Sequence, residues 1–265
     1  MTKEDRSVTN PIPFTADLRG IDCHIHSRFS PDAKNAGAGT PDEIVRAVRA
    51  KGLRGFVVTD HVDVGHWRDG EPIDFDKYFS TWQRVRDDNP DLTIYIGLEV
   101  GFEKRTAERS ARLIEALPLE YVINSVHYFA DGVRDVFSLG RVQAYSVYLD
   151  AVLASLDAPY PFTTIGHLGF PERYAPYPDG ERAMTYELFK PKLDTIIEKA
   201  VKRNVRFEEN TNAGGEMRLP RADFLRAYKA AGGVRPVLGS DAHVCANVGQ
   251  HFDKADKFLT DIFGK

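Results

Sequence analysis

Short runs of mostly apolar, β-forming residues recur seven times along the chain, and each run ends in a His, Asp, Glu or Asn. Segments with apolar residues at helical spacing separate these runs, and one of them carries Phe75, Tyr78, Phe79, Trp82 and Val85 on a single face. Largely apolar strands that alternate with amphipathic helices are typical of a parallel sheet covered on its outer face. The pattern therefore predicts an α/β fold of seven strand–helix units.

Local signals place the ends of several elements. Thr40 and Glu43 form a predicted capping box, Pro41 suits a first helical turn, and Gly52 is a natural helix stop. Pro236 cannot donate to a sheet ladder, so the seventh strand is expected to be short, bulged or at a seam. Later helices are expected over residues 185–203, 221–231 and 252–263.

Length and composition fit one soluble domain. The chain has 265 residues, of which 42% are hydrophobic and 28% charged, and its apolar runs fall short of the ~20 residues that a membrane span needs. Residues 1–17, with Pro11 and Pro13, read as an irregular leader, and residues 18–265 as a single domain. The N-terminus lacks the apolar core of a secretory signal, so a cytoplasmic location is expected.

The two cysteines, Cys23 and Cys245, exclude a disulfide framework and match a reducing compartment. Strand alternation predicts that Cys23 points to the face opposite His24, into the barrel wall, and leaves the role of Cys245 open. The net charge of -4 argues against a protein that mainly binds a nucleic-acid backbone. An anionic substrate would therefore need a local cationic patch or bound metal ions.

The polar residues at the strand ends form the candidate chemistry. The C-terminal ends of parallel barrel strands open onto one face, so scattered side chains would gather there. His24 and His26, two apart on a strand, project to the same side. A lone histidine is more often a hydrogen-bonded structural residue, but four further histidines share this topological position. The other strand-end residues are His61, Glu99, His127, His167, Glu209 with Asn210, Asp241 and His243.

So many ligands exceed what one ion can use. Two or three ions about 3.5 Å apart would fit, and such clusters promote phosphoryl or carbonyl hydrolysis. Mixed imidazole and carboxylate donors suit zinc, iron(II) or manganese(II), and the sequence does not decide among them. His66 and His251 lie outside this scheme and are interpreted as surface residues.

The ordered strand-end motifs resemble those of the polymerase and histidinol phosphatase (PHP) superfamily. The resemblance covers nearly the whole chain after the leader, and it implies a distorted (β/α)7 barrel as the catalytic domain, with a trinuclear metal site. The motifs are Asp22-Cys23-His24-Ile25-His26, Thr59-Asp60-His61, Gly97-Leu98-Glu99, Ser125-Val126-His127, Gly166-His167 and Gly239-Ser240-Asp241-Ala242-His243.

Carried over by position, the resemblance assigns three ion sites. Asp32 departs from a common family pattern that has a histidine there, and its other reading is a turn residue after Pro31. Glu99 would bridge the first and second ions. The first ion would take His24, His26, Glu99 and Asp241; the second Glu99, His127 and His167; the third Asp32, His61 and His243.

Within the superfamily, the chain looks most like histidinol-phosphate phosphatases of the PHP type. This resemblance implies hydrolysis of L-histidinol phosphate in histidine biosynthesis, with Arg173 and Arg218 binding phosphate. Asp241 or His243 would protonate the leaving alcoholate, and Asp241 is preferred because a ligand carboxylate can also hold the proton of the attacking water. A small phosphorylated substrate is expected, with no nucleic-acid or membrane partner, and the oligomeric state stays open. The alternatives are a PHP phosphodiesterase or exonuclease, an amidohydrolase, and a non-catalytic metal-stabilised interaction module.

Overall fold

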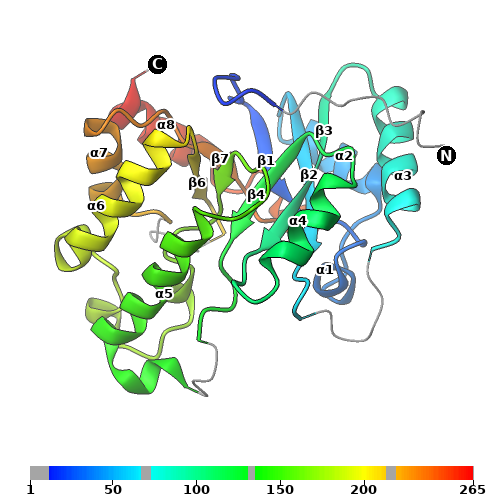
Figure 1. Ribbon diagram of the computed structural model, residues 1–265. Helices are drawn as coiled ribbons and strands as arrows, with labels where there is room; N and C mark the ends of the chain where they lie inside the picture. Colours follow the sequence, from blue (N-terminus) through cyan, green and yellow to red (C-terminus); the bar gives the residue numbers. More distant parts are fainter. Residues whose placement is uncertain (1–11, 67–72, 131–134, 213–218, 265) are drawn as a thin grey trace.

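Seven parallel strands follow one another in chain order around the fold (Figure 1). The computed structural model describes residues 12–66, 73–130, 135–212 and 219–264. Each strand pairs with the next one along the chain, as the seven-unit pattern predicts. The strands are β1 Ile21–Ile25, β2 Gly55–Val62, β3 Thr93–Gly101, β4 Tyr121–Ser125, β5 Thr164–Ile165, β6 Arg206–Asn210 and β7 Val237–Gly239.

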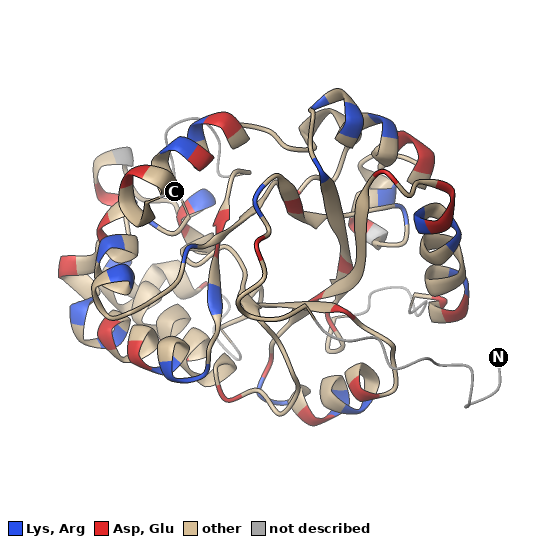
Figure 2. Ribbon diagram, turned by 90° about the horizontal axis from the view of Figure 1, so that it is seen from above, with Lys and Arg blue, Asp and Glu red and all other residues tan. Residues whose placement is uncertain are grey.

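The first strand meets the segment after the last strand, so the sheet nearly closes into a barrel. Ile25 and Ala242 form a parallel bridge. The backbone N–H of Asp241 donates to the His24 carbonyl at 2.8 Å, and that of His26 donates to the Ala242 carbonyl at 3.0 Å. Seen along its axis, the ring of strands is surrounded by helices (Figure 2). The predicted (β/α)7 barrel is confirmed.

Helices cover the barrel from outside and bury two large apolar clusters. One cluster packs Phe56 of β2 against Tyr78 and Trp82 of α3. The other packs Phe207 of β6 against Tyr228 of α7. The α-helices are α1 Pro31–Asn35, α2 Pro41–Ala50, α3 Phe75–Asp88, α4 Ala107–Glu115, α5 Arg141–Ser155, α6 Tyr186–Lys202, α7 Ala222–Ala230 and α8 Phe252–Phe263; short 3-10 turns are η1 Val136–Leu139, η2 Phe170–Arg173, η3 Asp179–Glu181 and η4 Cys245–Asn247.

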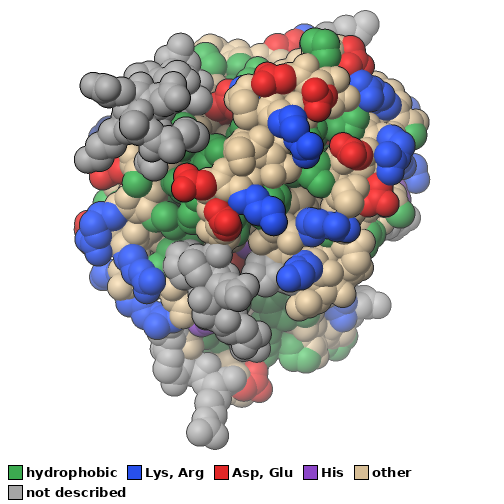
Figure 3. Space-filling view, turned by 90° about the vertical axis from the view of Figure 1, so that its right-hand side faces the viewer, with side chains coloured by type: hydrophobic (Ala, Val, Ile, Leu, Met, Phe, Trp, Pro, Cys, Tyr) green, Lys and Arg blue, Asp and Glu red, His purple; other side chains and the backbone are tan. Residues whose placement is uncertain are grey.

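The local sequence signals are found where they were predicted. The Thr40 hydroxyl accepts from the backbone N–H of Glu43, and the Glu43 carboxylate accepts from the backbone N–H of Thr40. Gly52 has a φ of 66°, which suits a glycine after a helix end. β7 has only three residues and begins directly after Pro236. Basic and acidic side chains are interspersed on the face in Figure 3, as expected for solvated helix surfaces.

A third apolar cluster fills the barrel interior near the N-terminal ends of the strands, where it packs Cys23 with Val57 and Ile123. The prediction that Cys23 faces away from His24 is wrong. β1 holds one extra residue relative to β2, because Asp22 pairs with Phe56 and Ile25 with Val58. This bulge places Cys23 and His24 opposite one residue, and both turn inward.

Candidate metal centre

The C-terminal ends of the strands, together with α1, bring the nine candidate ligands expected from the sequence to one mouth of the barrel. Among the described residues, four overlapping groups of three hold potential ligand atoms within 4.8 Å of one another. Three of the groups draw on the expected residues alone, and the fourth adds Asp63. The groups are His24, His26 and Asp241; Glu99, His127 and His167; His26, His61 and His243; and His61, Asp63 and His127.

Glu99 lies at the centre of this cluster and is fully buried. Its Oε1 is 2.9 Å from His167 Nε2 and 3.2 Å from His127 Nε2. Its Oε2 faces the other side, 3.2 Å from His24 Nε2 and 2.9 Å from His61 Nδ1. With one oxygen directed to each side, the carboxylate has the geometry of a bridge between two cations.

His24 and His26 converge on Asp241 beside this bridge. The two Nε2 atoms are 3.0 Å apart, and Asp241 Oδ1 is 3.3 Å from His26 Nε2. Asp241 has a left-handed backbone with a φ of 50°, a region that Asp tolerates better than most residues. All three side chains are buried, so this group is enclosed within the barrel.

The group around Asp32 is more open. Asp32 Oδ2 is 3.2 Å from His61 Nε2 and 3.1 Å from His243 Nε2. Its side chain is 54% exposed, whereas that of Glu99 is fully buried. Asp32 reaches this position from α1, whose preceding turn is tied to Asp60: the Asp60 carboxylate accepts from the backbone and hydroxyl groups of Ser27 and Ser30.

The donor set fits divalent cations. Two imidazole nitrogens that face each other at 3.0 Å need a shared proton or cation between them. Three buried atoms have no well-aligned hydrogen-bond partner among the described residues: Glu99 Oε2 and His61 Nδ1, which lie 2.9 Å apart, and His167 Nδ1. Tetrahedral or octahedral ions bound by imidazole and carboxylate would satisfy such atoms.

The charges and the burial within the cluster favour ionised Glu99 and neutral His26, which are the forms in which these groups bind metal ions. Burial opposes the charge of Glu99, but the charges of His24, His127 and His61 hold its pKa well below the usual range. Burial and the neighbouring His61 lower the pKa of His26 to about 3, so its imidazole is neutral. Burial also opposes the charged form of His127, but Asp63 and Glu99 raise its pKa to about 10. A metal ion would have to displace that proton.

Comparison with known families agrees with this geometry. A model of the PHP domain matches residues 22–212, which is most of the chain. The chain belongs to the PHP domain family. The match spans the strands from β1 to β6 and therefore includes all candidate ligands except Asp241 and His243, which follow β7.

Several curated proteins are similar to this chain over nearly their whole length. A probable histidinol-phosphatase of Clostridium acetobutylicum is 26% identical over 245 residues, covering 89% of this chain and 91% of that protein. One of Deinococcus radiodurans is 28% identical over 260 residues, covering 92% and 94%. The crystal structure of histidinol phosphate phosphatase from Lactococcus lactis, complexed with zinc, L-histidinol and phosphate, has a TM-score of 0.76 at 24% identity, covering 91% and 93%. That structural likeness shows a shared fold.

Glu208 contacts two of the candidate ligands and was not singled out in the sequence, where Glu209 was expected to face the site. Glu208 Oε1 is 2.7 Å from His24 Nδ1, and its Oε2 accepts from the backbone N–H of His167 at 2.7 Å. Glu208 and Asn210 face inward, so alternation turns Glu209 to the other face of β6. The pairing of Glu208 with Val237 of the inner apolar cluster, and of Glu209 with Leu238 of the outer one, indicates this orientation.

Asp63 is a second supporting residue that sequence reasoning missed. Its Oδ1 is 2.9 Å from His127 Nδ1. Alternation from His61 would have found it, because residues two apart share a face. A Cβ atom on Gly101 would lie 1.7 Å from Asp63 Oδ1, so this contact requires glycine there.

Arg173 reaches the same mouth from the η2 turn that follows His167. Its Nη1 donates to Asp241 Oδ2 at 3.0 Å, and its Nη2 donates to Asn210 Oδ1 at 2.6 Å. The guanidinium lies 5.3 Å from the Phe170 ring centre. The other arginine expected from the sequence, Arg218, lies outside the described residues.

Three further expectations from the sequence concerned His66, Cys245 and the absence of a membrane span. His66 is partly buried: its ring stacks on that of Tyr128, the neighbour of His127, and its Nε2 is 3.1 Å from Glu103 Oε1. Cys245 Sγ packs against Gly39 and belongs to none of the candidate ligand groups. Within the described residues, the helices are too short or too polar to cross a membrane.

Proposed function

We propose that this PHP protein is a metal-dependent phosphomonoesterase that hydrolyses L-histidinol phosphate to L-histidinol and phosphate, as a step of histidine biosynthesis. The observation that carries the proposal is the convergence of nine candidate ligands and Arg173 at one barrel mouth. The names of the curated relatives and the contents of the Lactococcus lactis crystal structure support the choice of substrate.

The residues present suit two or three divalent ions, either zinc, manganese or iron. One site would be held by His24, His26, Glu99 and Asp241; another by Glu99, His127 and His167; a third by Asp32, His61 and His243. Bound ions of this kind supply Lewis-acid chemistry, because they bring the pKa of water toward neutrality and stabilise negative charge on a phosphoryl group.

Arg173 is proposed to bind the phosphoryl group of the substrate. Its planar fork of donors matches phosphate oxygens, and its turn places it beside Asp241 at the mouth. In this structure the fork is occupied by Asp241 and Asn210. The same two partners would hold the guanidinium in position while its remaining N–H groups face the substrate. Arg218 is proposed to assist from the sequence pattern alone.

Asp241 is proposed to handle the proton. Its Oδ1 faces His26 and its Oδ2 faces Arg173, so the carboxylate stands between the ligand cluster and the phosphate-binding residue. Burial opposes its charge, but His24, His26 and Arg173 hold its pKa well below the usual range. An ionised carboxylate in this position can accept a proton from the attacking water and return it to the leaving alcohol oxygen.

A substrate panel tests the proposal. Purified protein with added zinc or manganese would be assayed with L-histidinol phosphate, other phosphomonoesters, a dinucleotide and an amide. We expect phosphate release from L-histidinol phosphate to be fastest, and His127→Ala to abolish it. His251→Asn is the matched control, because His251 is exposed and its left-handed backbone suits Asn. Preferential cleavage of the dinucleotide would instead support a phosphodiesterase.

A further inference from the structure

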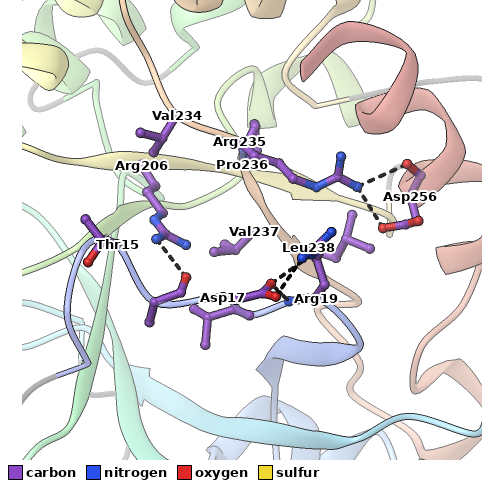
Figure 4. Close-up of a pocket in the computed structure, with 12 residues that line it drawn as sticks. Thr15, Asp17, Arg19, Arg206, Val234, Arg235, Pro236, Val237, Leu238 and Asp256 are labelled. Atoms are coloured by element: carbon purple, nitrogen blue, oxygen red, sulfur yellow. Dashed lines mark hydrogen bonds and ion pairs between the residues drawn. The ribbon is translucent and has the colours of Figure 1, made fainter. Parts of the chain in front are cut away.

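A cavity lies near the N-terminal ends of the strands, at the opposite end of the barrel from the candidate ligands, and Figure 4 shows the residues that line it. It has a volume of about 340 Å³ and is lined by the segment before β1, by the first residue of β6, by the start of β7 and by α8. The candidate ligands lie at the C-terminal ends of the strands, whereas these residues precede or begin strands. The cavity is therefore separated from the metal centre by the length of the barrel.

The lining is rich in arginine. Arg19, Arg206 and Arg235 line the cavity together with Asp17 and Asp256, which leaves one positive charge in excess. Arg19 pairs with Asp17 at 2.8 Å, and Arg235 pairs with Asp256 at 2.7 Å. Both carboxylates are therefore already partnered. The excess charge belongs to Arg206.

Arg206 is a buried cation without a carboxylate partner among the described residues. The residue is 8% exposed. Its Nη2 donates to the backbone carbonyls of Phe14 and Ala16, its Nε has no hydrogen-bond partner, and its guanidinium lies 5.4 Å from the Phe14 ring centre. Carbonyl oxygens satisfy part of the donor fork but bring no negative charge. Burying an unpaired charge is costly, and a bound anion would offset that cost.

We propose that this cavity is an anion site that takes a small molecule bearing a carboxylate or phosphate group. Arginine forks bind both groups with paired hydrogen bonds. In Figure 4 the side chain of Arg206 extends into the cavity from β6, while those of Arg19 and Arg235 border the other side. The volume lies within the range of small-molecule sites and suits a compact ligand. The site is independent of the metal ions and of the proposed hydrolysis.

Calorimetric titration of the metal-loaded protein tests this site, with malonate as the carboxylate probe and inorganic phosphate as the phosphate probe. Arg206→Gln removes the buried cation, and Arg19→Gln removes a cation whose side chain is 55% exposed and whose loss is easier for the fold to tolerate. Arg49→Gln is the matched control, because Arg49 forms a similar exposed pair with Asp91 elsewhere. Circular dichroism checks that each variant is folded.

We expect at least one probe to bind the wild-type protein and Arg49→Gln equally, and to bind Arg206→Gln and Arg19→Gln at least about tenfold more weakly. Phosphate bound at the metal centre would persist in every variant, and it is thereby distinguished from phosphate in the cavity. Binding of malonate alone identifies carboxylates as the ligand class, and binding of phosphate alone identifies phosphates. Equal affinities in all four proteins, or no binding beyond the metal centre, would overturn the proposal. If Arg206→Gln does not fold, Arg19→Gln decides alone.

Discussion

Glu208 holds two candidate ligands in place without belonging to any of the ligand groups. Contacts of this kind fix the orientation and basicity of a metal-binding imidazole. We therefore expect Glu208→Gln to weaken metal affinity about 10–100-fold, because a glutamine side chain has one accepting oxygen and cannot replace both carboxylate oxygens. Competition with a chelator of known affinity measures the change. Glu187→Gln, at an exposed position of α6, is the control. Unchanged affinity would show that Glu208 is only structural.

Glu172 gives a residue-level prediction about pH. Its residue is 1% exposed, and burial raises the pKa of its carboxyl to about 7, although the charge of Arg221 opposes the shift. Between the ordinary pKa of a glutamate and this raised value, the folded state binds more protons than the unfolded state. The contribution of Glu172 to the free energy of unfolding is therefore present at low pH and is lost as the pH rises toward the raised pKa.

Glu172→Gln should remove this dependence, since glutamine stays neutral. We expect the free energy of unfolding of the variant, minus that of the wild-type protein, to rise by about 1–3 kcal/mol as the pH increases from about 5 to about 8. Urea denaturation at both pH values measures the difference. A difference between the two proteins that is constant with pH would contradict the shifted carboxyl.

At the residue scale, the gathering of the candidate ligands at one mouth could be predicted because their types and order are in the sequence. The supporting residues were harder to find: alternation from His61 gives the direction of Asp63, but its contact with His127 and the choice of Glu208 depend on neighbouring strands. Choosing between Glu208 and Glu209 requires the phase of β6, which depends on its pairing with β7. Asp63 reaches His127 only because Gly101 leaves space on the neighbouring strand. These are relations between strands, and no single segment specifies them.

At the scale of elements, the packing of β7 against β6 and β1 depends on Gly239. A Cβ atom there would lie 1.9 Å from Glu208 Oε1 and 2.7 Å from His24 Cβ. Gly239→Ala should therefore displace both side chains and weaken metal affinity at least about tenfold. The same chelator competition applies. Gly180→Ala is the control, because a Cβ atom there meets nothing within 4 Å. Wild-type affinity in Gly239→Ala would show that the strands shift to make room.

Most elements could be predicted because their signals are local. The capping box of α2, the apolar face of α3 and the short β7 after Pro236 depend on a few neighbouring residues. The bulge in β1 could not be predicted in this way. It is defined by the register between β1 and β2, and it reverses the direction of Cys23 that simple alternation gives.

At the scale of the whole molecule, metal binding should be coupled to stability. Ligands that bind only the folded state raise the free energy of unfolding by mass action. Removing the ions with a chelator is expected to lower the thermal midpoint by about 5–10 °C, and adding zinc or manganese back should restore it. Differential scanning calorimetry measures both steps. Identical midpoints with and without ions would show that the folded protein does not bind them.

The hydrogen bonds that close the barrel are made by the backbones of His24, His26, Asp241 and Ala242, and three of these residues also supply candidate ligands. A cation bound by His24, His26 and Asp241 would link β1 to the segment after β7 and so stabilise the closure of the barrel. Once this cation is removed, the barrel should begin to open between β1 and the segment after β7, while the β2–β3 ladder, with its eight paired residues, stays closed. Amide hydrogen exchange would then accelerate first at His26 and Asp241. The region that carries the candidate chemistry would thus also be the first part of the barrel to unfold locally.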